Sequence, residues 1–136
     1  MEEIWDYHLG ADVWIINSKN QILIQKRSPK KRQSPNVWAM TGGSVIKGET
    51  SLQTIERETQ EELGIQLNMG NIQFIKHYKT RTVWLDTYFI RQDIDLKDVV
   101  MQEDEVFEVV ILNIQTIYTW STMVLFLIQS VEMMKN

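Results

Sequence analysis

One stretch, residues 43–65, constrains the fold of this chain more than any other. Its second half carries the signals of a helix, because Thr50 or Ser51 can cap the start and Gly64 provides a stop. Between these ends, the residues of one face recur at helical spacing, namely Leu52, Ile55, Thr59 and Leu63. The stretch therefore predicts a helix that packs one face on a core, preceded by a glycine-containing loop.

The same helix gathers carboxylates on one side. Glu58 and Glu62 are four residues apart and Glu58 and Glu61 are three apart, so their side chains project from one face. Like charges at this spacing destabilise a helix, and a bound cation would offset that repulsion. Carboxylate oxygens, without cysteine or paired histidine, favour a hard divalent ion, Mg²⁺ or Mn²⁺, over zinc. We therefore expect a magnesium or manganese site on this face.

Length and composition narrow the class of protein. A chain of 136 residues suits a single domain, residues 1–136, and 43% hydrophobic and 24% charged residues are ordinary for a globular protein. The net charge of −4 provides no general attraction to nucleic acid or to an anionic membrane. The chain has no cysteine, which excludes disulfides, thiolate metal sites and cysteine nucleophiles and agrees with a cytoplasmic location.

Neither end of the sequence predicts a targeting or membrane segment. Residues 1–8, MEEIWDYH, are acidic and lack the apolar run of a signal peptide. The longest apolar run, residues 123–128, is too short to span a bilayer. We therefore expect no membrane partner and no stable nucleic-acid partner.

Apolar runs predict strands on both sides of the central helix. Residues 10–17 and 21–26 are joined by a polar turn and predict a hairpin, and the apolar run at 13–16 predicts burial on both faces. Further strands are predicted at residues 37–41, 72–78, 83–91 and 106–112. Residues 113–118 predict a short helical turn. A last helix, residues 122–134, is apolar on nearly every side and would pack deeply on the sheet or form a homodimer contact.

A basic run lies between the second and third predicted strands. Residues 26–32, KRSPKKR, place five basic side chains in seven positions. One interpretation is a solvated loop, which is the usual structure of a charge run. The other is that some of these cations contact a phosphate chain, for which arginine is suited by its bidentate hydrogen bonding. Arg27, at the end of the strand, is the candidate substrate-binding residue.

Residues 43–65 resemble the Nudix box, G-x5-E-x7-R-E-U-x-E-E-x-G-U, in which U is a bulky aliphatic residue. The matching positions are Gly43, Glu49, Arg57, Glu58, Glu61, Glu62, Gly64 and Ile65. Seven fixed identities at fixed spacing arise by chance on the order of once in a million chains of this length. Thr59 departs from the pattern, but threonine is close to valine in shape, so we expect slightly poorer packing and unchanged chemistry. The resemblance implies an α+β fold, the Nudix α/β/α sandwich with a mixed β-sheet between helices.

The Nudix family hydrolyses a nucleoside diphosphate linked to another group, X, by attack of water on phosphorus. Carried across by position, the resemblance implies three metal ligands, Glu58, Glu61 and Glu62. The backbone carbonyl of the residue before the box, here Gly42, commonly joins the coordination. The resemblance also implies that Arg57 and Glu49 form an internal pair that fixes the loop against the helix.

A further acidic residue from a later loop often completes such a site, as a ligand or as the general base. The candidates are Glu103 and Glu105, beside the strand predicted from residue 106, and Glu105 is preferred. The base stays open between Glu61 and that loop residue, because family members differ in which glutamate takes the proton. The expected function is that of a pyrophosphohydrolase, dependent on Mg²⁺ or Mn²⁺, acting on a small-molecule diphosphate such as a nucleotide derivative.

Two other functions stay open. Residues 8–43 are similar in layout to isopentenyl-diphosphate isomerase, a Nudix-fold enzyme that moves a double bond, and His8 falls near one of its metal histidines. That enzyme needs a catalytic cysteine just before its box, and this chain has none. A non-catalytic nucleotide-binding module is the third possibility, although such members usually lose box glutamates and none is missing here. The box does not predict the group X, so nucleotides and non-nucleotide diphosphates are both open.

Overall fold

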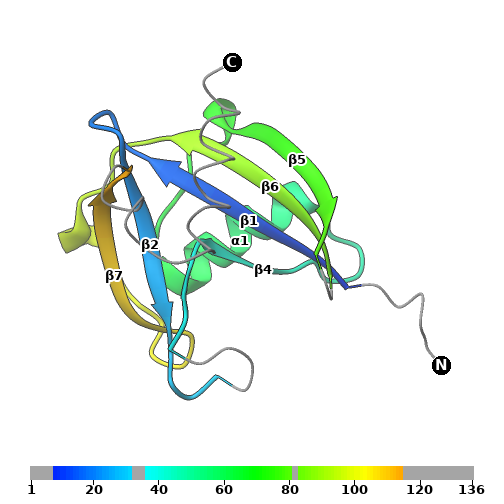
Figure 1. The fold of residues 1–136 in the computed structure, drawn as a ribbon, viewed down its shortest axis with the longest axis horizontal. Helices are drawn as coiled ribbons and strands as arrows, with labels where there is room; N and C mark the ends of the chain where they lie inside the picture. Colours follow the sequence, from blue (N-terminus) through cyan, green and yellow to red (C-terminus); the bar gives the residue numbers. More distant parts are fainter. Residues whose placement is uncertain (1–7, 32–35, 81–82, 115–136) are drawn as a thin grey trace.

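The computed structural model describes residues 8–31, 36–80 and 83–114, which are coloured in Figure 1. The strands are β1 (His8–Ile16), β2 (Gln21–Arg27), β3 (Trp38–Ala39), β4 (Thr41–Ser44), β5 (Gln73–Lys79), β6 (Val83–Arg91) and β7 (Val106–Asn113). The helices are α1 (Ser51–Leu63) and two 3₁₀ turns, η1 (Met69–Asn71) and η2 (Leu96–Asp98). The α+β class is confirmed. Within the described ranges, no helix has the length and apolar character needed to cross a membrane.

The strands form one mixed sheet with β1 at its centre. The order is β3-β2-β1-β6-β5, and β4 also pairs with β1 while β7 also pairs with β2. β1 and β6 are parallel and paired from the first residue of each to the last. β1 and β2 meet only at Ile16 and Ile22, so the predicted hairpin is a turn from which the strands diverge. β4 pairs with residues 10–13 of β1, which brings the glycine loop to the centre of the sheet.

Helix α1 begins and ends at the residues that its caps predict. Thr50 is the N-cap and forms a capping box, in which its side chain accepts from the Gln53 backbone N–H and the Gln53 side chain accepts from the Thr50 N–H. Ser51, the other predicted cap, is instead buried, with its hydroxyl 2.7 Å from the Tyr88 hydroxyl. Gly64 ends the helix in the left-handed conformation, at φ 68°.

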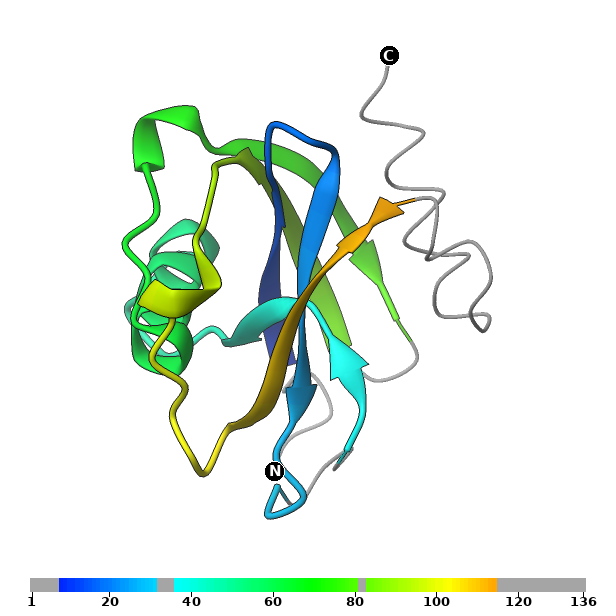
Figure 2. The same cartoon turned by 90° about the vertical axis from the view of Figure 1, so that its left-hand side faces the viewer.

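The core lies on both faces of the sheet. α1 covers one face, as Figure 2 shows, and there Ile55 and Leu63 pack against Val13 and Ile15 of β1. Trp14 and Ile16 point to the opposite face. The four residues from 13 to 16 are each at most 2% exposed, which confirms the predicted burial on both faces. Trp38 is half-buried and packs against the cluster on the second face.

The structure corrects the prediction of a single strand at residues 37–41. The chain forms β3 and β4 there, and Met40 separates them. β3 pairs with β2 and β4 pairs with β1, because the divergence of β1 from β2 leaves each with its own open edge. Asn113 ends β7, and Ile114 is the first helical residue of the predicted turn 113–118. The rest of that turn from residue 115, and the predicted helix 122–134, lie outside the described residues.

Candidate active site

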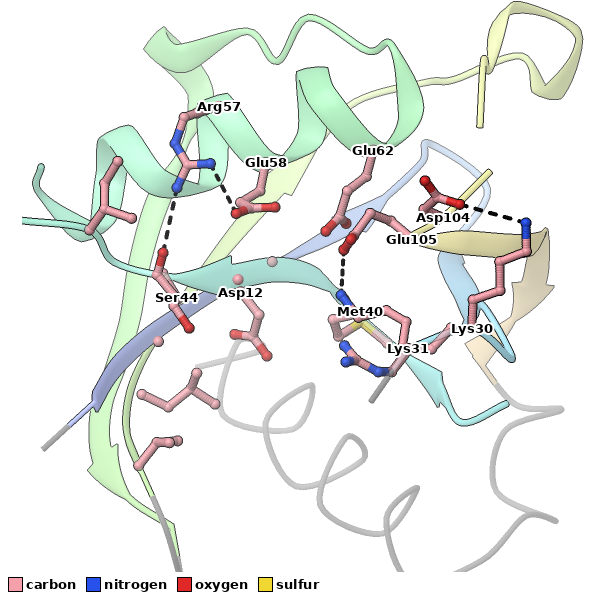
Figure 3. Close-up of a pocket in the computed structure, with 18 residues that line it drawn as sticks. Asp12, Lys30, Lys31, Met40, Ser44, Arg57, Glu58, Glu62, Asp104 and Glu105 are labelled. Carbon is pink, nitrogen blue, oxygen red and sulfur yellow. Dashed lines mark hydrogen bonds and ion pairs between the residues drawn. The ribbon is translucent and has the colours of Figure 1, made fainter. Parts of the chain in front are cut away.

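One pocket brings together the glycine loop, the acidic face of α1 and two distant loops (Figure 3). Its volume is about 910 Å³. Its polar side chains come from β1, β4, α1 and the loops around residues 27–31 and 104–105, and they are Asp12, Arg27, Lys30, Lys31, Ser44, Arg57, Glu58, Glu62, Asp104 and Glu105. The pocket therefore combines carboxylates with basic side chains.

The two glycines of β4 allow other groups to approach its backbone closely. A Cβ at Gly43 would lie 2.5 Å from both Cδ and Oε2 of Glu58, so the carboxylate of Glu58 rests directly on this residue. A Cβ at Gly42 would lie 2.1 Å from the backbone oxygen of Ala11 in β1. Neither position has room for a side chain, which explains why two glycines stand at this point of the sequence.

Glu62 is held by a buried chain of hydrogen bonds that links two strands of the sheet to α1. Gln25 Nε2 of β2 donates to Glu62 Oε1 at 2.9 Å, and Thr41 Oγ1 of β4 donates to Gln25 Oε1 at 3.0 Å. All three residues are at most 5% exposed. Because Thr41 occupies the amide oxygen, the amide nitrogen of Gln25 is directed at the carboxylate. Gln25 was not identified from the sequence, although a glutamine inside an otherwise apolar strand was a signal.

The environment of Glu62 disfavours the charged form of its carboxyl group. Burial raises the pKa of the Glu62 carboxyl well above its usual range, and the neighbouring carboxylates of Glu58 and Glu105 raise it further. The hydrogen bond from Gln25 acts in the opposite direction. A cation bound between these groups would relieve both the desolvation and the repulsion. Carboxylate oxygens are also the ligand type that a hard divalent ion prefers.

Arg57 connects the glycine loop with the helix. Its Nε donates to Glu49 Oε2 at 2.7 Å and its Nη2 donates to Glu49 Oε1 at 3.0 Å, which gives the bidentate internal pair expected from the resemblance. These hydrogen bonds, with one from the Thr54 hydroxyl, lower the pKa of Glu49 to about 2. Arg57 Nη1 also lies 3.0 Å from Glu58 Oε2 and 3.2 Å from Glu61 Oε1.

Glu61 does not share the position of Glu58 and Glu62. Its side chain is 54% exposed, pairs with Arg57 and does not line the pocket. Glu58 and Glu62 both line it. In the part of the chain that the structure describes, no three His, Cys, Asp or Glu side chains stand close enough together to hold a metal ion. The helical spacing thus put three carboxylates on one side, but tertiary contacts separate one of them.

The loop that follows η2 contributes Glu105 to the pocket and leaves Glu103 exposed outside it. Glu105 forms an ion pair with Lys31, and Asp104 lies 3.6 Å from Lys30. Arg27 lines the pocket with these lysines, so part of the basic run faces the acidic cluster. His8 is exposed at the start of β1 and is not among the lining residues.

Asp12 lines the same pocket from the centre of β1 and was not identified from the sequence. The Thr87 hydroxyl of β6 donates to Asp12 Oδ1 at 2.7 Å. Burial raises the pKa of the Asp12 carboxyl to about 6, against the lowering effect of hydrogen bonds from Thr87 and from its own backbone. The only signal in the sequence was a charged residue before the apolar run 13–16.

The chain has relatives among known proteins. The NUDIX domain model matches residues 6–123. An uncharacterized Nudix hydrolase of Listeria innocua is 41% identical over 105 residues, which cover 76% of this chain and 62% of that protein. An isopentenyl-diphosphate Delta-isomerase of Klebsiella pneumoniae is 34% identical over 62 residues, which cover 45% of this chain and 34% of that enzyme. The chain spans about three fifths of the length of its curated Listeria relatives.

The fold also has counterparts among solved structures. The crystal structure of the MutT protein from Methanosarcina mazei Go1 is similar over 96% of both chains, with a TM-score of 0.75 and 21% sequence identity. At that identity the likeness shows the fold alone. The family model covers most of the chain, and its box residues lie on β4, α1 and the turn between them. This chain therefore belongs to the Nudix family.

Proposed function

We propose that this chain is a metal-dependent pyrophosphohydrolase that cleaves the diphosphate linkage of a nucleoside diphosphate-X or related substrate by attack of water on phosphorus. The observation that carries the proposal is the meeting of Glu58, Glu62 and Glu105 with Lys30 and Lys31 in one pocket. Carboxylates suit the metal that such a reaction needs, and lysines suit the phosphates. Family membership supports a hydrolase of pyrophosphate bonds.

The residues that would hold Mg²⁺ or Mn²⁺ are Glu58 and Glu62, with the backbone carbonyl of Gly42 and with Glu61 as the further ligand expected from the box. When bound, the ion would offset the charge of the diphosphate and lower the pKa of a coordinated water. Gln25 orients the carboxylate of Glu62 for this role. Arg57 restrains Glu58 and ties α1 to Glu49 of the loop.

The chain offers two candidates for the proton acceptor, Glu61 and Glu105. Glu105 lines the pocket, whereas Glu61 points to Arg57 outside it. This difference supports Glu105 as the group that takes the proton from the attacking water. Lys31, which pairs with Glu105, would hold that carboxylate in position until substrate binds.

The basic side chains of the pocket would bind the phosphates. Arg27 can form bidentate hydrogen bonds to a phosphate, and Lys30 and Lys31 act as point charges. The substrate in this proposal is a small-molecule diphosphate, such as a nucleotide derivative, in the cytoplasm. The proposal includes a homodimer only because the apolar residues 122–134 could form its contact, and these residues lie outside the described ranges.

Isomerase activity is the second candidate, because an isopentenyl-diphosphate Delta-isomerase is among the relatives. The absence of cysteine from all 136 residues argues against it, since the acid that protonates the double bond would be missing. Incubation with isopentenyl diphosphate and analysis of the product would decide between the two. Formation of an isomer would favour this candidate over the hydrolase.

A panel of diphosphates assayed with Mg²⁺ and with Mn²⁺, reading out released phosphate or monophosphate, tests the hydrolase proposal. Glu58→Gln and Glu62→Gln should each lower turnover at least about a hundredfold if these carboxylates hold the metal. Glu56→Gln, on the same helix but outside the pocket, is the matched control and should remain active. Metal-independent turnover, or full activity in both pocket variants, would exclude this site. Binding without turnover across the panel would favour a non-catalytic module.

A further inference from the structure

A carboxylate stands on the apolar side of the central strand. Ala11 and Val13 of β1 point to the core under α1, so the alternation of side chains directs Asp12 to the opposite face, with Trp14 and Ile16. An aliphatic side chain would pack well at such a position. Asp12 is half-buried, and withdrawing a carboxylate from water is costly. Departures of this kind concentrate at functional sites.

The hydrogen bonds of Asp12 are incomplete. Oδ1 accepts from Thr87 Oγ1 at 2.7 Å, and the Tyr78 hydroxyl lies 3.5 Å from the same Thr87 oxygen. Among the described residues, Thr87 is the side chain that donates to this carboxylate, its own backbone adds one hydrogen bond, and the carboxylate has no ion pair. An ionised carboxylate has about four acceptor positions on its two oxygens, so acceptor positions remain available to a ligand.

Asp12 faces the pocket rather than the packed core. Gly10, two residues earlier on the same face, has no side chain to cover it, and a Cβ there would lie 3.3 Å from Leu85 Cδ1. Met40 and Val83 also line this part of the pocket. Figure 3 shows the Asp12 carboxylate on one side of β4 and the Glu58 and Glu62 carboxylates on the other. The pocket therefore has an acidic part under α1 and a largely apolar part with one carboxylate.

We infer that Asp12 is a recognition residue for the organic part of the substrate, and that it accepts hydrogen bonds from adjacent N–H donors on a nitrogen heterocycle. The inference rests on the proposed function, in which the diphosphate occupies the acidic and basic part of the pocket. The apolar neighbours of Asp12 suit a flat ring, and its two oxygens suit two N–H groups side by side. The guanine edge, with its ring N–H beside an exocyclic amine, has this arrangement. An isoprenoid group has no such donor.

Calorimetric titration with GMP, IMP and AMP tests the role of Asp12 without requiring turnover. IMP differs from GMP only in lacking the exocyclic amine, and AMP presents no adjacent pair of N–H donors. GMP should bind at least about fivefold more tightly than IMP, since a bidentate contact of this kind discriminates by that much or more. In Asp12→Asn, which keeps the shape but replaces one acceptor with a donor, the preference should fall below about twofold.

The matched control is Asp86→Asn. Asp86 lies on β6 next to Thr87, but its carboxylate bonds to His77 and does not line the pocket. The GMP preference should be unchanged in this variant. If Asp12→Asn does not fold by circular dichroism, Asp12→Ser removes the carboxylate with a smaller side chain and replaces it in the titration.

The outcomes separate this inference from the proposed function. No nucleotide preference in the natural protein, no binding at all, or the same preference in the Asp12 variant would overturn the role of Asp12. Metal-dependent hydrolysis combined with any of those results would leave the proposed function standing. An Asp12-dependent GMP preference in a protein that hydrolyses nothing would support the recognition site and overturn the hydrolase.

Discussion

Thr59 illustrates how a single residue departs from the pattern around it. It occupies the position of the Nudix box where a bulky aliphatic residue is expected, and it is fully buried. Its Oγ1 is the buried side-chain polar atom that has no hydrogen-bond partner among the described residues. A buried hydroxyl without a partner loses its hydration and gains nothing in exchange. Poorer packing was expected at this position from the sequence. The structure shows that the position also holds an unsatisfied polar atom.

Replacing that hydroxyl should stabilise the protein. Thr59→Val keeps the shape and removes the unpaired group, so the free energy of unfolding should rise by about 1 kcal/mol, measured by urea denaturation. Thr54→Val is the matched control, because Thr54 is equally buried but its hydroxyl donates to Glu49 Oε1 at 2.7 Å. That variant should be destabilised by about 1–3 kcal/mol. A loss of stability in Thr59→Val would mean that its hydroxyl has a partner.

The Glu49–Arg57 pair should make stability depend on pH in a defined window. The pKa of Glu49 is about 2 in the folded protein and 4.5 in its ordinary state, so the fold binds this proton less readily than the unfolded chain does. The contribution is therefore complete above pH 4.5 and is lost as the pH falls towards 2. Unfolding of the natural protein and of Glu49→Gln, followed from pH 7 to pH 2, should give a stability difference that shrinks in this window. A difference that is constant with pH would contradict the assignment.

At the scale of elements, the geometry of the site depends on polar side chains that connect β2 and β4 to α1. Gln25 of β2 links Thr41 of β4 to Glu62 of α1, and each of these side chains is buried. The chain of hydrogen bonds fixes one oxygen of Glu62, and the residue lines the pocket. Buried networks of this kind are rigid when every member is satisfied, and they orient metal ligands.

Removing Gln25 should weaken metal binding while the protein still folds. Gln25→Leu leaves the Glu62 and Thr41 oxygens without their partner, which should cost about 1–3 kcal/mol of stability. The affinity for Mn²⁺, measured by calorimetry or electron paramagnetic resonance, should fall by roughly tenfold or more.

Gln21→Leu provides the control on the same strand. The Gln21 side chain accepts from Asn17 Nδ2 at 2.9 Å, outside the active-site pocket. The Gln21→Leu variant should therefore bind Mn²⁺ with the affinity of the natural protein. Equal affinities in the two variants would show that Gln25 does not orient a metal ligand.

At the scale of the whole molecule, the pocket is a junction of segments that are distant in sequence. Lys31 reaches Glu105, 74 residues away, and Thr87 reaches Asp12, 75 residues away. The parallel pairing of β1 with β6 and the pairing of β2 with β7 bring these segments together. Binding at such a junction should therefore stabilise the entire fold, because the ligands belong to several elements at once.

Divalent ions should raise the melting temperature of the protein. At a free Mn²⁺ concentration about 100 times the Kd, binding to the folded state alone contributes about 2.7 kcal/mol. Scanning calorimetry with Mn²⁺ and with a chelator measures the shift. The shift should be lost in Glu62→Gln and retained in Glu56→Gln. A shift that persists in the Glu62 variant would place the ion elsewhere.

The sequence predicted much of this molecule. The central helix, an N-cap at Thr50 or Ser51 and the stop at Gly64 follow from residues within a few positions of one another, and the structure selects Thr50. The strand at 83–91 was predicted with the bounds of β6. The splitting of residues 37–41 into β3 and β4 was missed, because it depends on which strand edges are open. Among the two loop candidates, Glu105 lines the pocket as preferred and Glu103 does not.

The sequence by itself determined which residue types are available for chemistry and that Glu58, Glu61 and Glu62 share one side of a helix. The composition of the chain decides the first, and local spacing decides the second, because an α-helix repeats about every 3.6 residues. Only the tertiary structure decided that Glu61 pairs with Arg57, that Gln25 supports Glu62 and that Asp12 faces the pocket. The last two arrangements depend on how the sheet joins distant parts of the chain. The Glu61–Arg57 pair lies within α1, but Arg57 is held in position by Glu49 of the loop.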